Sequence, residues 1–361
     1  MSDKIFNFIL RQVLAKTPNA NVYRVENDGG TAVLKVLRTG NPSVTELARF
    51  KQEYTILKGL KIEGIVCPID IIESGEGIAI LEKDYAGLQS LKDVIKKKKK
   101  LDPGEFLRVA ISVSQTMGEL HSKNIIHKDL KPANILVDPA METAKITGWG
   151  ISSILFSHDE EIFRRDVIEE TLVYMSPEKT GRTNRDLDYR TDLYSMGVTF
   201  YEALTGSLPF ISDDPMEIIH AHIARKPLPA MEMDISIPEV LSEIIDKLLC
   251  KTPEERYQSG FGVMHDLKLC LKAHDAQKPM EPFPLALMDI SAHFNIPQVL
   301  IGRQSELDTL LSAFDRFVDG KRETILVRGR PGIGKSALVN EIRKPVLARR
   351  GYFISGKYDQ L

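Results

Sequence analysis

The spacing of apolar residues changes along this chain, and this change limits the folds that it can adopt. Up to residue 85 the chain has short β-rich runs, including 21–25 and 31–37 on either side of a hairpin turn at 27–30. One helical stretch, 43–60, lies among them. After Leu88 the spacing is mostly helical, and helices are expected over 106–121, 191–205, 216–223 and 240–249. A small β-rich part therefore precedes a larger helical part.

A second change comes at His274, where the chain becomes rich in proline and loses periodicity as far as Pro297. Beyond this predicted linker we expect a helix over 305–317, a buried strand over 324–328 and a helix over 336–347. One β–α unit cannot bury both faces of its sheet, so we expect a longer parent chain. The expected division is a domain over 1–273, a linker over 274–300 and a truncated domain over 301–361.

Composition excludes several classes of protein. Lys and Arg number 48 and Asp and Glu 50, a formal charge of −2, which gives no reason to expect nucleic acid or membrane as a partner. Three cysteines without paired spacing exclude a disulfide framework or a zinc cluster and fit a reducing compartment. No signal peptide or spanning segment is evident, so the expected location is the cytoplasm.

The strongest local signal is the run from His127 to Asn134, which ends just before the β-rich run 135–137. Its acid, Asp129, is followed two residues later by the cation Lys131 and five residues later by the amide Asn134. Phosphoryl transfer needs a carboxylate to orient the acceptor hydroxyl, a cation near the moving phosphate and an oxygen ligand for magnesium. These residue types at this spacing indicate that chemistry.

The run resembles the catalytic loop of the eukaryotic-type protein kinases, and further residues follow that family's order over about 270 positions. The resemblance implies an α+β, two-lobed kinase-like fold that uses ATP and Mg²⁺. In it, Asp129 is the catalytic carboxylate, Lys131 contacts the γ-phosphate and Asn134 is a metal ligand. The implied reaction is phosphorylation of Ser or Thr on a protein substrate.

The same resemblance assigns residues outside the loop. Lys35 would hold the α- and β-phosphates, with Glu53 as its partner, and the segment from Glu82 to Tyr85 would be the hinge that meets adenine. Further positions are implied for the end of the activation segment (176–178), its buried partner (Arg256), the helix start that braces the catalytic loop (192–197) and a threonine typical of serine/threonine kinases (Thr171).

Three features depart from the family pattern. Lys128 stands beside the acid where the family has an arginine that grips a phosphorylated activation loop, which argues against control by phosphorylation of that loop. Gly148-Trp149-Gly150 stands where the family has Asp-Phe-Gly, so a main magnesium ligand is missing. The phosphate-covering loop, at residues 17–23, lacks the family's glycines. Two hypotheses therefore stay open: a working serine/threonine kinase in which Asn134 or Asp138 retains the metal, or a pseudokinase that regulates or binds nucleotide through Lys35.

A second constellation, 329–336, matches Gly-x4-Gly-Lys-Ser, the P-loop of nucleotide-binding proteins. Backbone N–H groups at its glycines would cradle phosphate, Lys335 would reach the β- and γ-phosphates, and the hydroxyl of Ser336 would ligate magnesium. The glycines are Gly329, Gly332 and Gly334. A Walker B acid does not follow within the given sequence, so the motif predicts nucleotide binding and leaves hydrolysis unassigned.

Ahead of the P-loop, 301–307 resembles the entry of AAA-like signalling ATPases. The chain is similar to bacterial hybrid proteins that join a Ser/Thr kinase, an AAA-like ATPase, a GAF domain and a histidine kinase. The resemblance rests on the order of the kinase-like part and the P-loop, and on the runs 176–192 and 352–360. This resemblance implies that signalling domains follow in the parent chain. The kinase domains of these proteins also tend to lack the glycine-rich loop.

Overall fold

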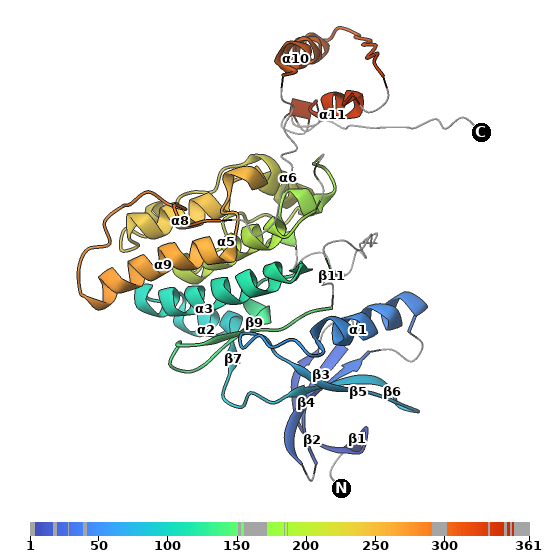
Figure 1. The fold of residues 1–361 in the computed structure, drawn as a ribbon, viewed down its shortest axis with the longest axis vertical. Coiled ribbons are helices and arrows are strands. Elements are labelled where there is room, and N and C mark those ends of the chain that lie inside the picture. The colour runs from blue at the N-terminus through green and yellow to red at the C-terminus, as the bar shows by residue number, and fades with distance from the viewer. Residues whose placement is uncertain are drawn as a thin grey trace.

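The computed structural model describes most of the chain. The described residues are 4–16, 20–27, 29–38, 42–150, 153–154, 172–183, 185, 187–290, 302–330, 333–342, 345–346 and 349. They form an N-terminal lobe built on a sheet, a helical C-terminal lobe and a pair of helices after residue 301 (Figure 1).

The N-terminal lobe is a six-stranded antiparallel sheet with the order β1-β2-β3-β4-β6-β5. The predicted hairpin is confirmed, since β3 and β4 pair along their whole length and the tight turn ends at Gly30, whose φ is +108°. The strands are β1 (Lys4–Ile5), β2 (Phe8–Lys16), β3 (Ala20–Asn27), β4 (Gly30–Leu37), β5 (Pro68–Ser74) and β6 (Gly77–Lys83).

Helix α1 (Val44–Leu57) covers one face of this sheet, as the helical spacing predicts. Its start is fixed by a capping box, in which the Ser43 hydroxyl accepts the N–H of Glu46 and the Glu46 carboxylate accepts the N–H of Ser43. Phe50 packs against Ile78 and Ile80 of β6. The helix is thereby held beside the strand that carries Lys35.

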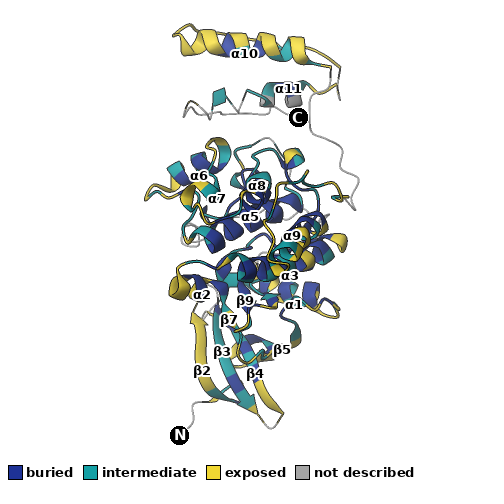
Figure 2. Ribbon diagram, turned by 90° about the vertical axis from the view of Figure 1, so that its left-hand side faces the viewer, coloured by how far each residue is buried: buried dark blue, intermediate teal, exposed yellow. Residues whose placement is uncertain are grey.

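The C-terminal lobe surrounds α5 (Arg190–Thr205), which is buried along nearly its whole length (Figure 2). A helix that is covered on all sides is expected at the centre of a helical domain. Around it lie α2 (Leu91–Lys98), α3 (Pro103–Ser122), α6 (Pro215–Ala224), α7 (Ala230–Met233), α8 (Glu239–Leu248) and α9 (Gly260–Asp275). Three of the four predicted helices lie within one of these elements, and the fourth, 240–249, runs one residue past the end of α8.

Short elements carry the site between the lobes. The catalytic run ends in η1 (Pro132–Asn134) and lies between β8 (Ile125–Ile126) and β9 (Ile135–Val137). Strand β9 pairs with β10 (Ala144–Ile146) and β7 (Gln89–Ser90). Ile65 bridges Ile146, and this contact joins the segment after α1 to the helical lobe. The remaining short elements are β11 (Ser153–Ile154), η3 (Glu178–Thr180) and η4 (Pro253–Glu255).

The region after residue 301 contains α10 (Gln304–Val318) and α11 (Lys335–Asn340). The predicted helix at 305–317 is confirmed, but the buried strand predicted over 324–328 is wrong. Ile325 is 43% and Leu326 72% exposed, and none of the sheets in the described residues includes this segment. A strand is stable only beside a partner strand, and none of the described strands lies next to this one.

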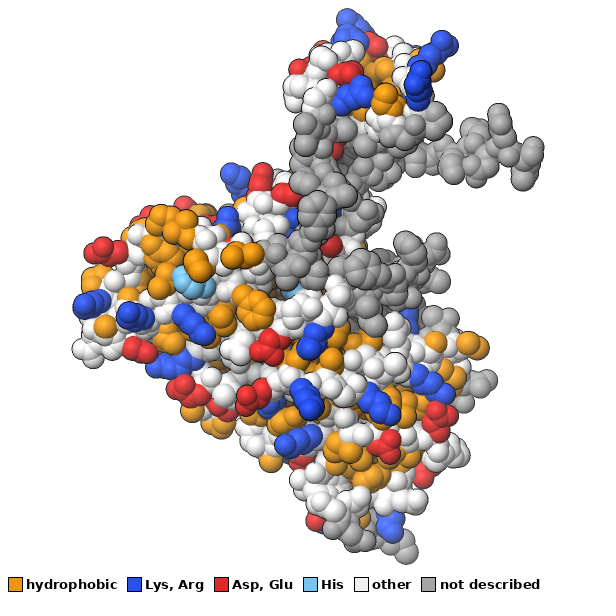
Figure 3. All heavy atoms as spheres, viewed as in Figure 1, with side chains coloured by type: hydrophobic (Ala, Val, Ile, Leu, Met, Phe, Trp, Pro, Cys, Tyr) orange, Lys and Arg blue, Asp and Glu red, His pale blue; other side chains and the backbone are white. Residues whose placement is uncertain are grey.

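Among the described helices, none combines the length and the apolar character that crossing a membrane requires. On the face drawn in Figure 3, blue and red side chains are interspersed and no broad field of one sign is seen. This distribution agrees with the near-zero formal charge.

Candidate functional site

Lys35 and Glu53 form a close ion pair between β4 and α1. The ammonium Nζ of Lys35 lies 2.6 Å from Oε1 and 2.7 Å from Oε2 of Glu53, whose side chain is 2% exposed. Burial by itself lowers the pKa of Lys35, but the charges of Glu53 and Glu82 and the hydrogen bond raise it above its ordinary value. Lys35 is therefore a cation held at a fixed place at neutral pH.

Glu82 lies beside this pair. Along β6, Ile78, Ile80 and Glu82 share the face toward α1, and Glu82 pairs with Val33, two residues from Lys35. Burial raises the pKa of the Glu82 carboxyl to about 7, although the charge of Lys35 opposes this shift. A carboxyl group that titrates near neutral pH thus lies next to the Lys35–Glu53 pair.

The Tyr85 ring lies near two lysine side chains and lines a cavity. Nζ of Lys83 lies 5.5 Å and Nζ of Lys145 4.7 Å from the centre of this ring. The ring lines a cavity of about 460 Å³ together with residues 60–63 and Cys67. Of the two predicted hinge side chains, Glu82 is therefore near Lys35, whereas Tyr85 faces this separate cavity.

The catalytic loop brings Asp129, Lys131 and Asn134 together. Nζ of Lys131 lies 3.0 Å from Oδ2 of Asp129, and Nδ2 of Asn134 donates to the same Oδ2 at 2.9 Å. Nδ2 also donates to the backbone carbonyl of Asp129 at 2.7 Å. The three residues that the sequence singled out form one hydrogen-bonded unit with a fixed carboxylate.

Asp192, at the start of α5, holds the backbone of this loop. Its Oδ1 accepts the N–H of Lys128 at 2.7 Å, and its Oδ2 accepts the N–H of His127 at 2.8 Å and lies 3.0 Å from Nε2 of His121. Burial raises the pKa of Asp192, but the bond to His121 and the other partners outweigh burial and lower it. Lys128 is held at φ +67°, a conformation that these bonds impose on a residue with a side chain.

The departure at Gly148 has a clear geometry. Gly148 has φ +85°, and a Cβ built there would lie 2.6 Å from both Nδ2 and Oδ1 of Asn134. The Asn134 amide thus fills the space next to the glycine. The neighbouring Trp149 is 1% exposed and its ring meets that of His127 edge-on, with 4.6 Å between the ring centres.

The end of the activation segment is anchored as the sequence predicts. Arg256 donates from Nη1 to Oε1 of Glu178 at 2.7 Å and from Nη2 to Oε2 at 2.8 Å, and both residues are buried. This bidentate pair is confirmed. Thr171, predicted to approach Asp129 and Lys131, lies outside the described residues, as do 17–19 of the phosphate-covering loop.

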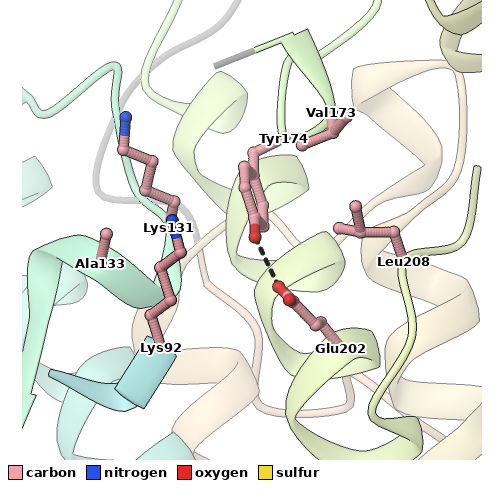
Figure 4. Close-up of a pocket in the computed structure, with 7 residues that line it drawn as sticks. All are labelled: Lys92, Lys131, Ala133, Val173, Tyr174, Glu202 and Leu208. Atoms are coloured by element: carbon pink, nitrogen blue, oxygen red, sulfur yellow. Dashed lines mark hydrogen bonds between the residues drawn. The ribbon is translucent and has the colours of Figure 1, made fainter. Parts of the chain in front are cut away.

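A cavity of about 360 Å³ opens beside Lys131, and its lining was not predicted from the sequence. In Figure 4, Lys92 and Lys131 stand on one side, and Tyr174 and Leu208 on the other. The Tyr174 hydroxyl donates to Oε2 of Glu202 at 2.5 Å, and burial raises the pKa of that carboxyl. No local spacing could reveal the Tyr174–Glu202 pair, because it joins the chain before η3 to the C-terminal part of α5.

The P-loop is described in part. Nζ of Lys335 donates to the carbonyls of Gly329 and Arg330, each at 2.9 Å, and Gly334 has φ +89° where α11 begins. The lysine therefore lies over the loop that the motif predicts. Gly332 and the side chain of Ser336 lie outside the described residues.

Comparison with known proteins agrees with this geometry. The model of the protein kinase domain matches residues 14–267, and that of the AAA ATPase domain matches residues 299–361. The chain is 30% identical over 351 residues to hybrid signal transduction histidine kinase G of Dictyostelium discoideum, covering 73% of this chain and 10% of that protein.

Two bacterial kinases are similar over the N-terminal part. A probable serine/threonine-protein kinase of Clostridium perfringens is 33% identical over 236 residues, which cover 65% of this chain and 34% of that protein. The serine/threonine-protein kinase PknB of Mycobacterium leprae is 28% identical over 293 residues, covering 78% and 46%. This chain spans less than half the length of each of these relatives. From the match over residues 14–267 and the geometry above, the chain belongs to the protein kinase domain family, and it continues into an AAA ATPase domain.

Proposed function

We propose that the domain over residues 1–273 transfers the γ-phosphate of ATP to Ser or Thr hydroxyls of a protein. The observation that carries this proposal is the Asp129–Lys131–Asn134 unit, with its carboxylate fixed by two partners. Serine/threonine-protein kinases among the similar proteins support the choice of acceptor.

The proposed roles follow from charge and position. Lys35, fixed by Glu53, would hold the α- and β-phosphates, and the ammonium of Lys131 would balance charge on the γ-phosphoryl group. Asp129 would orient the acceptor hydroxyl and take its proton. The acceptor oxygen bonds to the γ-phosphorus while the bond from that phosphorus to the bridging oxygen breaks, and ADP leaves. The backbone of 82–85 would meet the base.

Magnesium fits this site as an ion that the nucleotide carries in. Mg²⁺ keeps several waters and binds through one or two carboxylates together with phosphates. Near the catalytic loop, Asp129 and Asn134 offer oxygens, whereas Gly148 offers none from a side chain. Asn134 would be the ligand, with Ser336 in the same role at the P-loop, and the ion would neutralise charge between the phosphates.

A second candidate function, a pseudokinase that binds nucleotide and regulates other domains, is favoured by Gly148 itself. The loop keeps its packing through Trp149 but supplies no carboxylate to a metal. Lys35 and its partner would still hold a nucleotide in this case. The two candidates differ in whether phosphate reaches a protein hydroxyl.

The setting is also part of the proposal. The P-loop of the 301–361 domain would bind a second nucleotide through Gly329, Gly332, Gly334 and Lys335, and 274–300 would connect it to the kinase domain. We place the protein in the cytoplasm, which three free cysteines support, with signalling domains on a longer parent chain.

The test is transfer of labelled γ-phosphate from ATP to a generic protein acceptor such as casein by the full chain with Mg²⁺. Asp129→Asn should reduce transfer by about 100-fold or more, because it removes the proton acceptor and keeps the size of the side chain. Asp213→Asn, at an exposed acid of the C-terminal lobe, is the matched control and should transfer like wild type. Lys335→Ala should leave transfer to casein intact.

Equal transfer by wild type and Asp129→Asn would remove the kinase proposal. The pseudokinase candidate then predicts that ATP raises the unfolding temperature of the wild type and that this shift disappears in Lys35→Ala. If ATP raises the unfolding temperature of neither the wild type nor Lys335→Ala, nucleotide binding is excluded at both the kinase domain and the P-loop.

A further inference from the structure

The segment that joins the two matched domains is docked on the C-terminal lobe. It lies outside both family matches, which end at 267 and begin again at 299. After α9, residues 276–290 form no helix or strand, in agreement with their proline content. Met280, Phe283, Leu285 and Ala286 nevertheless pack against the core of the lobe. We refer to residues 280–290 as the strap.

Asp289 of the strap binds at the start of α9. The hydroxyl of Ser259 donates to Oδ1 of Asp289 at 2.7 Å, and the backbone N–H of Gln258 donates to Oδ2. A carboxylate is favoured at a helix N-terminus, because N–H groups and the positive end of the helix dipole are directed toward it. Gly262, in the first turn of α9, gives it room, since a methyl group there would overlap Oδ1 of Asp289.

A buried acid of α9 fixes the middle of the strap. Asp266 of α9 is 2% exposed, and its Oδ2 accepts the backbone N–H of Ala286 at 2.8 Å and the hydroxyl of Tyr257 at 2.7 Å. Ala286 has φ +63°, so this bond forms at a turn that is unfavourable for a residue with a side chain. The C-terminal lobe therefore recognises three features of the strap: apolar side chains, one backbone N–H and one carboxylate.

We propose that this face of the C-terminal lobe, formed by Tyr257, Gln258, Ser259, Gly262 and Asp266, is a docking site for an apolar peptide segment that carries an acid, and that the strap occupies it within the same chain. When the strap is docked, the connection to the AAA-matching region starts after Asp289. Without docking it would start at the end of α9. This role goes beyond phosphoryl transfer and does not depend on it.

The consequence for the tether is large. With the strap docked, residues 291–301 connect the two domains, and eleven residues reach at most about 40 Å. With the strap released, residues 276–301 would connect them, and 26 residues reach at most about 90 Å. A shorter tether raises the effective concentration of one domain near the other. The docked strap thus limits where the second nucleotide-binding region can lie.

Hydrogen–deuterium exchange on the full chain tests the docking. Asp289→Ala should raise the exchange rates of the amides of Gln258 and Ala286 by about fivefold to tenfold, with no change in β3, β4 and β6. Glu281→Ala, at an exposed acid of the same strap, is the matched control and should exchange like wild type. Unchanged exchange at Gln258 and Ala286 in Asp289→Ala would overturn the proposal.

Gly262→Ala separates docking from general stability. Alanine favours a helix over glycine, so α9 itself should become more stable, yet the methyl group should expel Asp289 and release the strap. A rise in exchange at Ala286 but not in α3 or α5 supports the proposal even if Asp289→Ala folds poorly. A synthetic peptide of residues 278–291, added to full-length Asp289→Ala, should restore protection at Gln258. The same peptide with Asp289→Asn should restore less protection, and equal rescue by both peptides would refute recognition of the carboxylate.

Discussion

The catalytic loop and the magnesium loop lie against each other, but different forces hold them. Two backbone N–H groups of the catalytic loop donate to the buried carboxylate of Asp192, which His121 of α3 also contacts. The magnesium loop is held by packing of Trp149 and by bonds of Thr147, whose N–H donates to the Asn134 carbonyl at 3.0 Å and whose carbonyl lies 2.9 Å from Nε2 of His127. His127 thus contacts both loops.

This difference shows that the position of a loop and the charge it supplies are separable. Replacement of an acid by Gly148 removes a carboxylate, yet Trp149 stays buried and Asn134 fills the adjacent space. The carboxylate of Asp129 keeps both of its partners. The site has lost charge and kept its architecture, which is why both the kinase and the pseudokinase candidates fit it.

Removal of the Trp149 ring should have the largest effect on stability. Trp149→Ala leaves a cavity beside His127 and should lower the free energy of unfolding by about 3–5 kcal/mol, measured by urea denaturation. Trp149→Phe keeps an aromatic ring and leaves a smaller cavity, so it should cost less than Trp149→Ala. Equal losses in the two variants would show that packing does not hold the magnesium loop.

Asp192→Asn tests the polar anchor of the catalytic loop. The amide keeps one accepting oxygen but directs its NH₂ group at one of the two N–H donors, that of His127 or that of Lys128. We expect a loss of about 1–3 kcal/mol of unfolding free energy at pH 7. Asp266→Asn, at a buried acid of α9, gives a matched comparison outside the loop.

The pH dependence of this loss has a definite sign. Because the folded pKa of Asp192 is lowered, the carboxylate stabilises the fold above its unfolded pKa, and this contribution disappears as pH falls through the folded value. The gap in unfolding free energy between wild type and Asp192→Asn should therefore be widest near neutral pH and shrink below about pH 4. A gap that is constant down to acid pH would mean that the charge of Asp192 does not anchor the loop.

What the sequence could predict depended on whether the determining contacts were local. The hairpin at Gly30, helix α1 and the grouping of residue types in the run that ends at Asn134 follow from spacing over a few residues, and the structure contains all three. The strand expected at 324–328 failed, because a strand depends on a partner that its own sequence does not contain.

Long-range contacts set the features that the sequence left out. Glu82 was assigned to the hinge, but only pairing of β6 with β4 reveals that its carboxyl lies beside Lys35. The binding of Asp289 to α9 likewise joins residues 30 apart, with no motif to mark it. Arg256 was linked to Glu178 from the family's order of residues, and not from spacing.

Gly148→Ala should have a smaller effect than either change above, of about 1–2 kcal/mol. Its φ of +85° disfavours a residue with a side chain, and the new methyl group would press on the Asn134 amide. Gly150→Ala is a matched control in the same loop, since a Cβ there would meet no described atom closer than 4.0 Å. Thermal unfolding that ranks the two glycines in the opposite order would contradict the contact between Gly148 and Asn134.

Gly148→Asp should cost less stability than Trp149→Ala, Asp192→Asn or Gly148→Ala. Aspartate tolerates a positive φ better than alanine does, and its Cβ still requires the Asn134 amide to move. The change adds the carboxylate that the loop lacks, and Mg²⁺ prefers such oxygens. We therefore expect Mg²⁺ to enlarge the rise in unfolding temperature on adding ATP more in Gly148→Asp than in wild type. The same comparison in Gly148→Asn, which has nearly the same shape without the charge, isolates the carboxylate. The opposite result is that Mg²⁺ enlarges the ATP-induced rise in unfolding temperature equally in wild type, Gly148→Asp and Gly148→Asn. That result would contradict the view that the magnesium loop differs from the catalytic loop by a missing carboxylate.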